Sequence, residues 1–294
     1  AMAVEKAKET DAELVMASDP DADRVGAAVK NNEGEWVLLN GNQTALMFVY
    51  YLITRWKELG KINGKEYIVK TIVTTETIKT IAERNGVEMY DVYTGFKWIA
   101  NVMRENEGKK NYIGGGEESY GFLCEDFVRD KDAVSACVIL AEIAAWAKDQ
   151  GLSLYQLLQK IYVEYGFSKE KGISVVKKGK SGAEEIEAMM KKFRENPLTE
   201  IAGSKVTYFY DYSTLKGKDY AENETVTLDM PTTSNVLQYF TEDNTKVSIR
   251  PSGTEPKIKF YCEVHSKVKN IDELPEAEKA AEEKINQIKA SLGI

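Results

Sequence analysis

The chain has 294 residues, of which 43% are hydrophobic and 29% charged, and its formal net charge is −8. This composition is that of a globular protein of roughly two domains, and the acidic charge argues against a nucleic-acid-binding protein. No apolar run approaches the ~20 residues of a membrane span and no signal peptide is recognisable, so no membrane partner is expected. Three scattered cysteines and a single histidine argue against disulfide frameworks and Cys/His metal sites, and favour a reducing cytoplasm.

The first polar stretch follows an apolar run at 14–16, which we expect to form a buried strand. Residues 19–24 then read Asp-Pro-Asp-Ala-Asp-Arg. Carboxylates on alternate residues can converge on one hard cation, and an adjacent arginine supplies a bidentate phosphate donor. The stretch therefore predicts a site for a divalent cation and a phosphoryl group, formed by Asp19, Asp21, Asp23 and Arg24.

Two other interpretations of residues 19–24 stay open. An Asp-rich turn after a strand is often only a solvated loop. A metal-dependent phosphatase with Asp19 as its nucleophile is the second alternative, because aspartate can form a phosphoenzyme. An EF-hand is excluded, since its sixth position requires Gly and holds Arg24, and its twelfth requires Glu and holds Lys30.

The first 166 residues predict two segments. Residues 1–40 contain a helix, a strand, the Asp loop and a hairpin, too little to bury a core, so we interpret them as the remnant of another α/β domain. Residues 41–166 alternate helices and strands over short links, which favours an α/β domain with a largely parallel sheet. Its expected helices cover 40–57, 75–85, 95–105 and 132–149, and its expected strands cover 67–73, 87–93 and 112–114.

Two polar loops follow strand ends in this segment, where ligands of open α/β sheets bind. In the first, Gly95 allows a close approach after Thr94, and Lys97 can reach a phosphate or hydroxyl; an ordinary helix N-terminus is an equal alternative. In the second, the glycine-rich loop 114–121, carboxylate and hydroxyl groups suit sugar hydroxyls. The groups in question are Glu117 and Ser119, and Lys131 either faces the same cleft or belongs to helix-capping chemistry.

Residues 167–294 predict an α+β domain with a small antiparallel sheet and two helices, at 182–195 and 274–291. Its expected strands cover 173–177, 206–212, 225–229, 235–240, 246–249 and 257–264. Between the last two lies a loop, 250–257, that two prolines make rigid and whose side chains and glycine amides suit a phosphate. Its expected phosphate-binding residues are Arg250, Ser252, Gly253, Thr254 and Lys257, with an ordinary hairpin turn as the alternative.

Three loops in this order, for metal, sugar and phosphate, resemble those of the α-D-phosphohexomutases, the family of phosphoglucomutases and phosphomannomutases. The matching stretches are 19–24, 116–122 and 250–257, and residues 94–97 resemble the additional substrate-recognition loop of the family. The resemblance covers essentially the whole chain, and the sugar loop is more similar to the phosphoglucomutase branch. Phe127 departs from relatives that carry a histidine at that place.

The resemblance implies an enzyme that interconverts hexose 1-phosphate and hexose 6-phosphate through a phosphoserine and a hexose bisphosphate. It implies Mg²⁺ on the three aspartates, catalytic roles for Arg24 and Lys131, and substrate binding by the other loop residues named above. The chain has no match to the family's phosphoserine loop, so we expect a C-terminal fragment, inactive alone, whose partners are the missing N-terminal domains. A non-catalytic sugar-phosphate-binding module would carry the same loops and stays an alternative.

Overall fold

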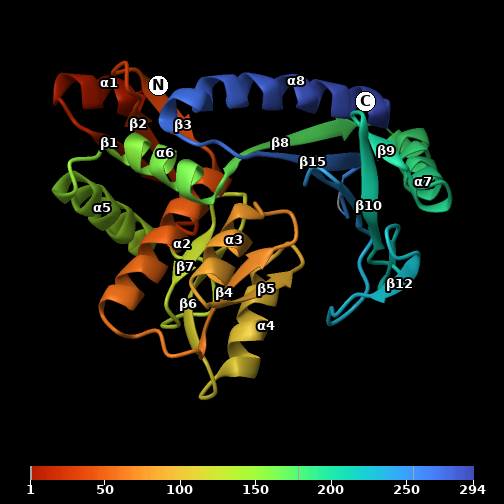
Figure 1. The fold of residues 1–294 in the computed structure, drawn as a ribbon, viewed down its shortest axis with the longest axis horizontal. Helices are drawn as coiled ribbons and strands as arrows, with labels where there is room; N and C mark the ends of the chain where they lie inside the picture. The colour runs from red at the N-terminus through yellow and green to blue at the C-terminus, as the bar shows by residue number, and fades with distance from the viewer. Residues whose placement is uncertain (1, 178, 254) are drawn as a thin grey trace. The chain divides into compact units, whose positions relative to one another are not determined.

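The computed structural model describes residues 2–177, 179–253 and 255–294, and the chain forms two compact units, Ala1–Gly166 and Phe167–Ile294. Figure 1 shows the elements of both units. The predicted classes are confirmed: the first unit contains a mixed, mainly parallel α/β sheet, and the second contains an antiparallel sheet with two long helices. The three-segment division at residues 40 and 166 stays a prediction.

The first unit begins with helix α1 (Met2–Glu9) and an antiparallel sheet of order β1-β2-β3. Its strands are β1 (Leu14–Ser18), β2 (Val25–Lys30) and β3 (Trp36–Leu39). The central strand β2 is largely buried, whereas the side chains of β1 are half-buried or exposed. The prediction of a buried strand at 14–16 was therefore wrong in burial, because β1 is an edge strand that pairs only with β2.

The second sheet of this unit has the order β5-β4-β6-β7. Strands β4 (Glu66–Thr71), β5 (Glu88–Val92) and β6 (Asn111–Gly116) are parallel, and β7 (Phe122–Cys124) runs antiparallel to β6. Every residue of β4 is buried, as expected for the central strand of a covered parallel sheet. The ends of β5 and β6 lie at the same edge, so the loops that follow them are neighbours.

Five helices accompany this sheet. They are α2 (Gly41–Glu58), α3 (Thr77–Arg84), α4 (Phe96–Asn106), α5 (Ala133–Asp149) and α6 (Leu154–Tyr165). Helix α4 packs against β4, β5 and β6 around a core that includes Tyr67, Ile99 and Leu123. Helix α2 starts at a capping box, in which the Asn40 side chain accepts from Gln43 N and the Gln43 side chain accepts from Asn40 N.

The glycine run Gly114–Gly116 corrects one expectation. We expected the strand to end at Gly114 and the loop to begin there, but all three glycines belong to the end of β6. A Cβ on Gly115 would lie 2.4 Å from the Val69 carbonyl oxygen, and one on Gly116 would lie 2.5 Å from the Phe122 ring. These glycines therefore let β6 pack closely between β4 and β7, and the loop itself is only residues 117–121.

The second unit is built on an antiparallel path of order β12-β11-β10-β13-β14-β15-β8, with β9 pairing β10. Helices α7 (Gly179–Glu195) and α8 (Leu274–Leu292) both contact β15, and a short 3-10 helix, η1 (Ile271–Glu273), precedes α8. The strands are β8 (Phe167–Val176), β9 (Glu200–Ile201), β10 (Ser204–Asp211), β11 (Lys216–Asp219), β12 (Glu224–Thr227), β13 (Leu237–Thr241), β14 (Lys246–Pro251) and β15 (Lys257–Ser266). The phosphate-loop residues thus connect the paired strands β14 and β15.

Candidate functional site

The Asp loop, residues 19–24, joins β1 to β2 and is closed by its own backbone. Oδ1 of Asp19 accepts from the backbone N–H groups of Asp23 and Arg24, each at 3.2 Å. Desolvation raises the pKa of Asp19, but these hydrogen bonds and the Arg24 charge outweigh it, so the pKa is lowered and the carboxylate form is favoured. Asp21 and Arg24 are exposed at the surface of the loop.

The three aspartates do not converge in this loop. Within the described part of the chain, no three His, Cys, Asp or Glu side chains come together as a metal site. The donor chemistry nevertheless suits Mg²⁺, which prefers carboxylate oxygens. Oδ1 of Asp23 is buried and accepts no hydrogen bond from the described residues, and its ion-pair partner, Nε of Arg24, lies at 3.7 Å, beyond hydrogen-bond distance. Asp23 is therefore the loop residue that best fits a cation.

Lys131 connects the Asp loop to the rest of the unit. Its Nζ lies 3.1 Å from Oδ2 of Asp23 and 2.9 Å from Oδ1 of Asp130, and 5.3 Å from the centroid of the Phe96 ring. Desolvation lowers the pKa of Lys131, but the two carboxylates raise it more, so the net shift is upward. Lys131 is thus held as a cation beside the Asp loop.

The residue that follows Lys131 in the sequence caps the next helix. Asp132 is the N-cap of α5, and its side chain accepts from the backbone N–H groups of Val134 and Ser135. The backbone N–H of Ala133 donates to the carbonyl of Ala22 in the Asp loop. Capping in this segment is therefore carried out by Asp132, and Lys131 pairs with Asp23.

The sugar loop, residues 117–121, contacts the Asp loop directly. Arg24 and Gly121 form an antiparallel β-bridge, and the N–H of Val25 donates to the Tyr120 carbonyl. A Cβ on Gly121 would lie 2.2 Å from Cδ of Lys131. Glycine at this position therefore makes room for the lysine stem between the two loops. The sequence offered only the glycine itself as a signal for this contact.

Glu117 and Gly95 join the two predicted sugar-recognition loops. Glu117 is buried, and its Oε1 accepts from the Gly95 N–H at 2.7 Å. Gly95 has φ 112°, in the region that favours glycine, and it is the N-cap of α4. The carboxylate of Glu117 is thus fixed by a backbone donor.

The remaining predicted residues of the first unit are more loosely placed. Thr94 and Ser119 are half-buried, beside Gly95 and Glu117 respectively. Lys97 is exposed, and its Nζ lies 5.0 Å from the Trp98 ring centroid. The first unit therefore brings together Asp23, Arg24, Lys131, Gly95 and Glu117, but leaves Asp21 and Lys97 at the surface.

The phosphate loop of the second unit is a tight connection between β14 and β15. The N–H of Ser252 donates to the Lys257 carbonyl at 2.8 Å, and Oγ of Ser252 accepts from the N–H of Glu255 at 3.3 Å. Lys257 pairs with Glu255 at 2.5 Å, an ion pair that lowers the pKa of Glu255. Arg250 is half-buried and Gly253 is exposed. Thr254 lies outside the described residues.

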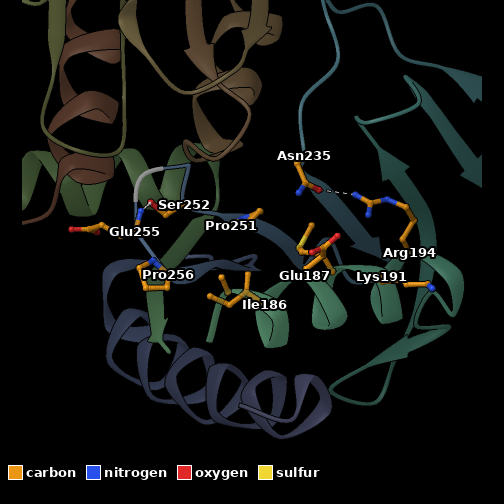
Figure 2. Close-up of a pocket in the computed structure, with 11 residues that line it drawn as sticks. Ile186, Glu187, Lys191, Arg194, Asn235, Pro251, Ser252, Glu255 and Pro256 are labelled. Atoms are coloured by element: carbon orange, nitrogen blue, oxygen red, sulfur yellow. Dashed lines mark hydrogen bonds between the residues drawn. The ribbon is translucent and has the colours of Figure 1, made fainter. Parts of the chain in front are cut away.

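A pocket of about 510 Å³ lies within the second unit between α7 and the phosphate loop (Figure 2). Pro251 and Ser252 line it from the loop, and Ile186 lines it from α7. At its other end, Arg194 donates to Oδ2 of Asp211 at 3.0 Å and to Oδ1 of Asn235 at 2.7 Å. The phosphate loop therefore forms one wall of this pocket.

None of the helices in the described part of the chain combines the length and the hydrophobicity that crossing a bilayer requires.

The sequence matches two family models. Residues 40–165 match phosphoglucomutase/phosphomannomutase, alpha/beta/alpha domain III, and residues 175–281 match the C-terminal domain of the same family. The phosphoglucomutase of Staphylococcus aureus (strain USA300) is 38% identical over 272 residues, which are 92% of this chain and 48% of the relative. That of Staphylococcus haemolyticus is 33% identical over 264 residues, or 90% and 47%. The chain thus spans about half the length of these curated relatives.

Solved structures show the same fold. The open form of pp63/parafusin, a phosphoglucomutase from Paramecium, aligns with 96% of this chain and 46% of its own at a TM-score of 0.59 and 17% identity. A phosphoglucomutase/phosphomannomutase family protein from Burkholderia thailandensis aligns with 99% of this chain and 49% of its own, at a TM-score of 0.60 and 18% identity. The chain therefore belongs to the phosphoglucomutase/phosphomannomutase family, of which it contains domains III and IV.

Proposed function

We propose that the chain is the sugar-phosphate-binding half of a phosphohexomutase that interconverts hexose 1-phosphate and hexose 6-phosphate through a hexose bisphosphate. The observation that carries this proposal is the junction at Lys131, where the Asp loop and the sugar loop meet around one cation. Phosphoryl transfer depends chiefly on positioning and on charge stabilisation, and a lysine held beside an Asp loop suits both.

In the proposed reaction, each side chain has a distinct task. Glu117 and Ser119 bind sugar hydroxyls, with Thr94, Gly95 and Lys97 completing recognition of the sugar. Arg24 provides a bidentate donor to the phosphoryl oxygens. Lys131, which the carboxylates of Asp130 and Asp23 hold as a cation, places a positive charge beside the transferring group and stabilises its negative charge.

Mg²⁺, when bound, would neutralise the charge of the phosphoryl group. Asp19, Asp21 and Asp23 would hold it, with Asp23 best prepared because its buried Oδ1 accepts no hydrogen bond from the described residues. The ion pair between Lys131 and Asp23 competes for the same carboxylate, so we expect weak metal affinity in this chain alone.

The phosphate that does not react binds, in this proposal, to the loop of the second unit. Arg250 grips it by its fork, and the hydroxyls of Ser252 and Thr254, the Gly253 amide and Lys257 supply further donors. We place the enzyme in the reducing cytoplasm, where its three free cysteines stay as thiols.

The activity itself can be tested with a coupled assay for conversion of glucose 1-phosphate to glucose 6-phosphate, with glucose 1,6-bisphosphate as activator. We expect no turnover from this chain alone, because the loops contain no serine left over for the phosphoserine role. We expect turnover when an upstream serine-bearing segment is supplied. Turnover by the chain alone would contradict the proposal. So would a lack of turnover by a folded protein that contains the upstream segment.

A further inference from the structure

The sugar loop carries a second carboxylate, Glu118, to which the proposed function gives no role. Its Oε2 accepts from Oγ1 of Thr71 at 3.3 Å. Thr71 is the last residue of β4 and its side chain is fully buried. The contact therefore ties the sugar loop to the carboxyl end of the central strand.

We propose that Thr71 and Glu118 are positioning residues that hold Glu117 in the direction needed for binding a sugar hydroxyl. This inference rests on the proposed function, because it concerns the same sugar loop. Neither residue would touch the substrate; both would act through the backbone that connects Glu118 to Glu117.

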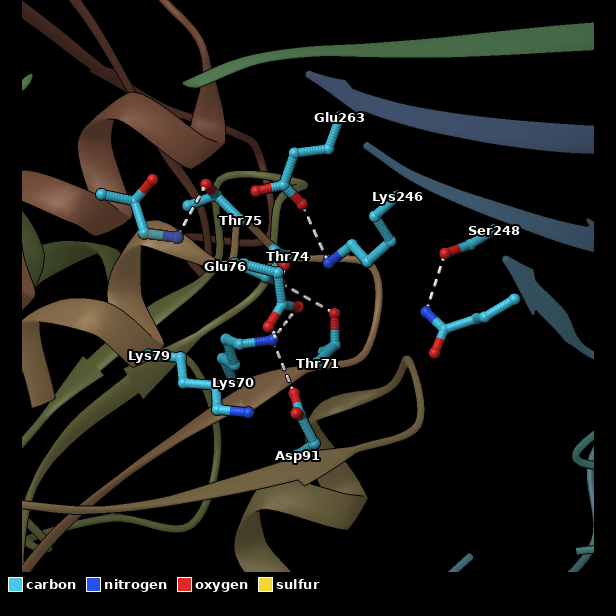
Figure 3. Close-up of polar contacts among 12 residues, drawn as sticks. Lys70, Thr71, Thr74, Thr75, Glu76, Lys79, Asp91, Lys246, Ser248 and Glu263 are labelled. Carbon is cyan, nitrogen blue, oxygen red and sulfur yellow. Dashed lines mark hydrogen bonds and ion pairs between the residues drawn. The ribbon is translucent and has the colours of Figure 1, made fainter. Parts of the chain in front are cut away.

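The hydroxyl protons of this contact can be assigned. Oγ1 of Thr71 and Oγ1 of Thr74 are 2.8 Å apart, and either could be the donor. A threonine hydroxyl has only one proton, so when Thr71 donates to the carboxylate, Thr74 must donate to Thr71. Both side chains are fully buried, so no bulk water competes for these protons. The result is a short relay of two hydroxyls, those of Thr74 and Thr71 (Figure 3), and the Thr71 hydroxyl donates to Glu118.

The base of this relay is rigid. Lys70, the neighbour of Thr71 in β4, is buried and pairs through Nζ with Oδ1 of Asp91 at 2.6 Å and with Oε1 of Glu76 at 2.9 Å (Figure 3). Asp91 belongs to the adjacent strand β5 and Glu76 directly precedes α3. The end of β4 is therefore fixed from two sides.

The two neighbouring carboxylates are anchored at the ends of two neighbouring strands. Glu118 binds Thr71 at the end of β4, and Glu117 binds the Gly95 N–H, which follows β5. The backbone between them is also confined, because a Cβ on Gly41 would lie 2.0 Å from the Glu118 carbonyl oxygen. With Glu118 released from Thr71, the direction of Glu117 would depend on its side-chain contact with the Gly95 N–H and on its own backbone N–H, which donates to the Gly121 carbonyl.

The decisive variants are Thr71→Val, which keeps the shape of the side chain but removes the hydroxyl, and Thr71→Ser, which restores the hydroxyl. Thr54→Val is the matched control, because the Thr54 hydroxyl donates to the Tyr50 carbonyl within α2. Two quantities are measured on the 294-residue chain: the ¹H–¹⁵N resonance of the Gly95 amide, and the Kd for glucose 1,6-bisphosphate from an NMR titration.

We expect Thr71→Val to shift the Gly95 amide resonance of the free protein in the direction that a weaker hydrogen bond from Gly95 to Glu117 would give. We also expect it to weaken bisphosphate binding about tenfold, the scale of one hydrogen bond to a charged group. Thr71→Ser should restore both quantities, whereas Thr54→Val should lower stability without moving either one.

An unchanged Gly95 resonance and Kd in a folded Thr71→Val variant would overturn the inference, as would a serine variant that behaves like valine. If Thr71→Val does not fold, Glu118→Ala removes the acceptor instead and must give the same shift. If the wild-type chain does not bind the bisphosphate, the proposed function fails; the Gly95 resonance of the free protein still decides whether Thr71 positions the loop.

Discussion

At Gly41, the absence of a single methyl group allows the sugar loop to lie against the start of α2. The nearest atom to a Cβ built there would be a backbone oxygen, that of Glu118, at 2.0 Å, so relief by side-chain rotation is not available. Gly121 differs, because the atom that a Cβ would meet belongs to the flexible stem of Lys131. Two glycines in one site thus have different tolerances, which a sequence cannot distinguish.

Gly41→Ala should destabilise the chain by about 1–3 kcal/mol, the range for overpacking, although alanine is normally favoured over glycine in a helix. Urea unfolding measures this free energy. Gly26→Ala is the control, since its Cβ would have only the Ala17 carbonyl oxygen near it, at 3.9 Å, and its stability should stay within about 0.5 kcal/mol of the wild type. Equal stability of the two variants would show that the loop does not need this close approach.

Among the elements, helix α5 is connected to the site through its N-cap, Asp132, which directly follows Lys131. Asp132→Ala should cost about 0.5–2 kcal/mol, whereas Asp132→Ser should retain most of the stability. Desolvation raises the pKa of Asp132, but hydrogen bonds from Ser135 and Val134 lower it more. The cap therefore stabilises above the ordinary pKa of 3.8 and is lost as pH falls through the lowered value. Urea unfolding at pH 7 and pH 3 tests this, and an alanine variant as stable as the wild type at pH 7 would contradict it.

Strand β15 carries a second pH-sensitive group, His265. Its Nε2 lies 2.8 Å from Oε1 of Glu263, although the pair lacks hydrogen-bond alignment, and Lys246 pairs with Oε2 of Glu263 at 2.9 Å. Burial lowers the pKa of His265 and so does Lys246, but the carboxylates of Glu263 and Glu170 raise it more, giving a net upward shift. Burial raises the pKa of Glu263, and the two cations lower it strongly.

Because the folded pKa of His265 exceeds its ordinary 6.5, the stabilisation is fully present below pH 6.5 and is lost as pH rises through the folded value. The free energy of unfolding of the wild type should therefore fall as pH rises from 6 through the folded pKa of the imidazole, relative to His265→Gln. Urea titrations of both proteins across this range provide the comparison. Parallel pH profiles would mean that the imidazole is not held as a cation.

For the whole molecule, sequence patterns predicted both sheet classes and where along the chain the three loops fall, but not their exact ends, because hydrophobic periodicity and turn residues are local signals. They did not predict α6, although Ser153 and Gln156 form a capping box that marks its start. They also placed the glycines of β6 in a loop, because glycine composition alone does not distinguish a loop from a closely packed strand.

The contacts that make the site could not be predicted for a different reason. The pairing of Lys131 with Asp23, and that of Glu117 with Gly95, join residues that are distant in the sequence and meet only through the topology of the sheet. The same holds for the aspartates, whose alternate spacing predicted convergence, whereas the folded loop directs Asp19 to its own backbone and Asp23 to a lysine.

The central claim is that these loops bind hexose phosphates, and a titration of this chain with glucose 1,6-bisphosphate, followed by ¹H–¹⁵N NMR, tests it most directly. We expect saturable shifts of the Gly95 amide and of amides in residues 250–257. Arg250→Ala should weaken binding about tenfold or more, since a charge-assisted contact is lost, whereas Arg55→Ala, whose arginine pairs with Glu58 on α2, should not. Absence of saturable shifts in both loops, or equal affinity of wild type and Arg250→Ala, would contradict the account.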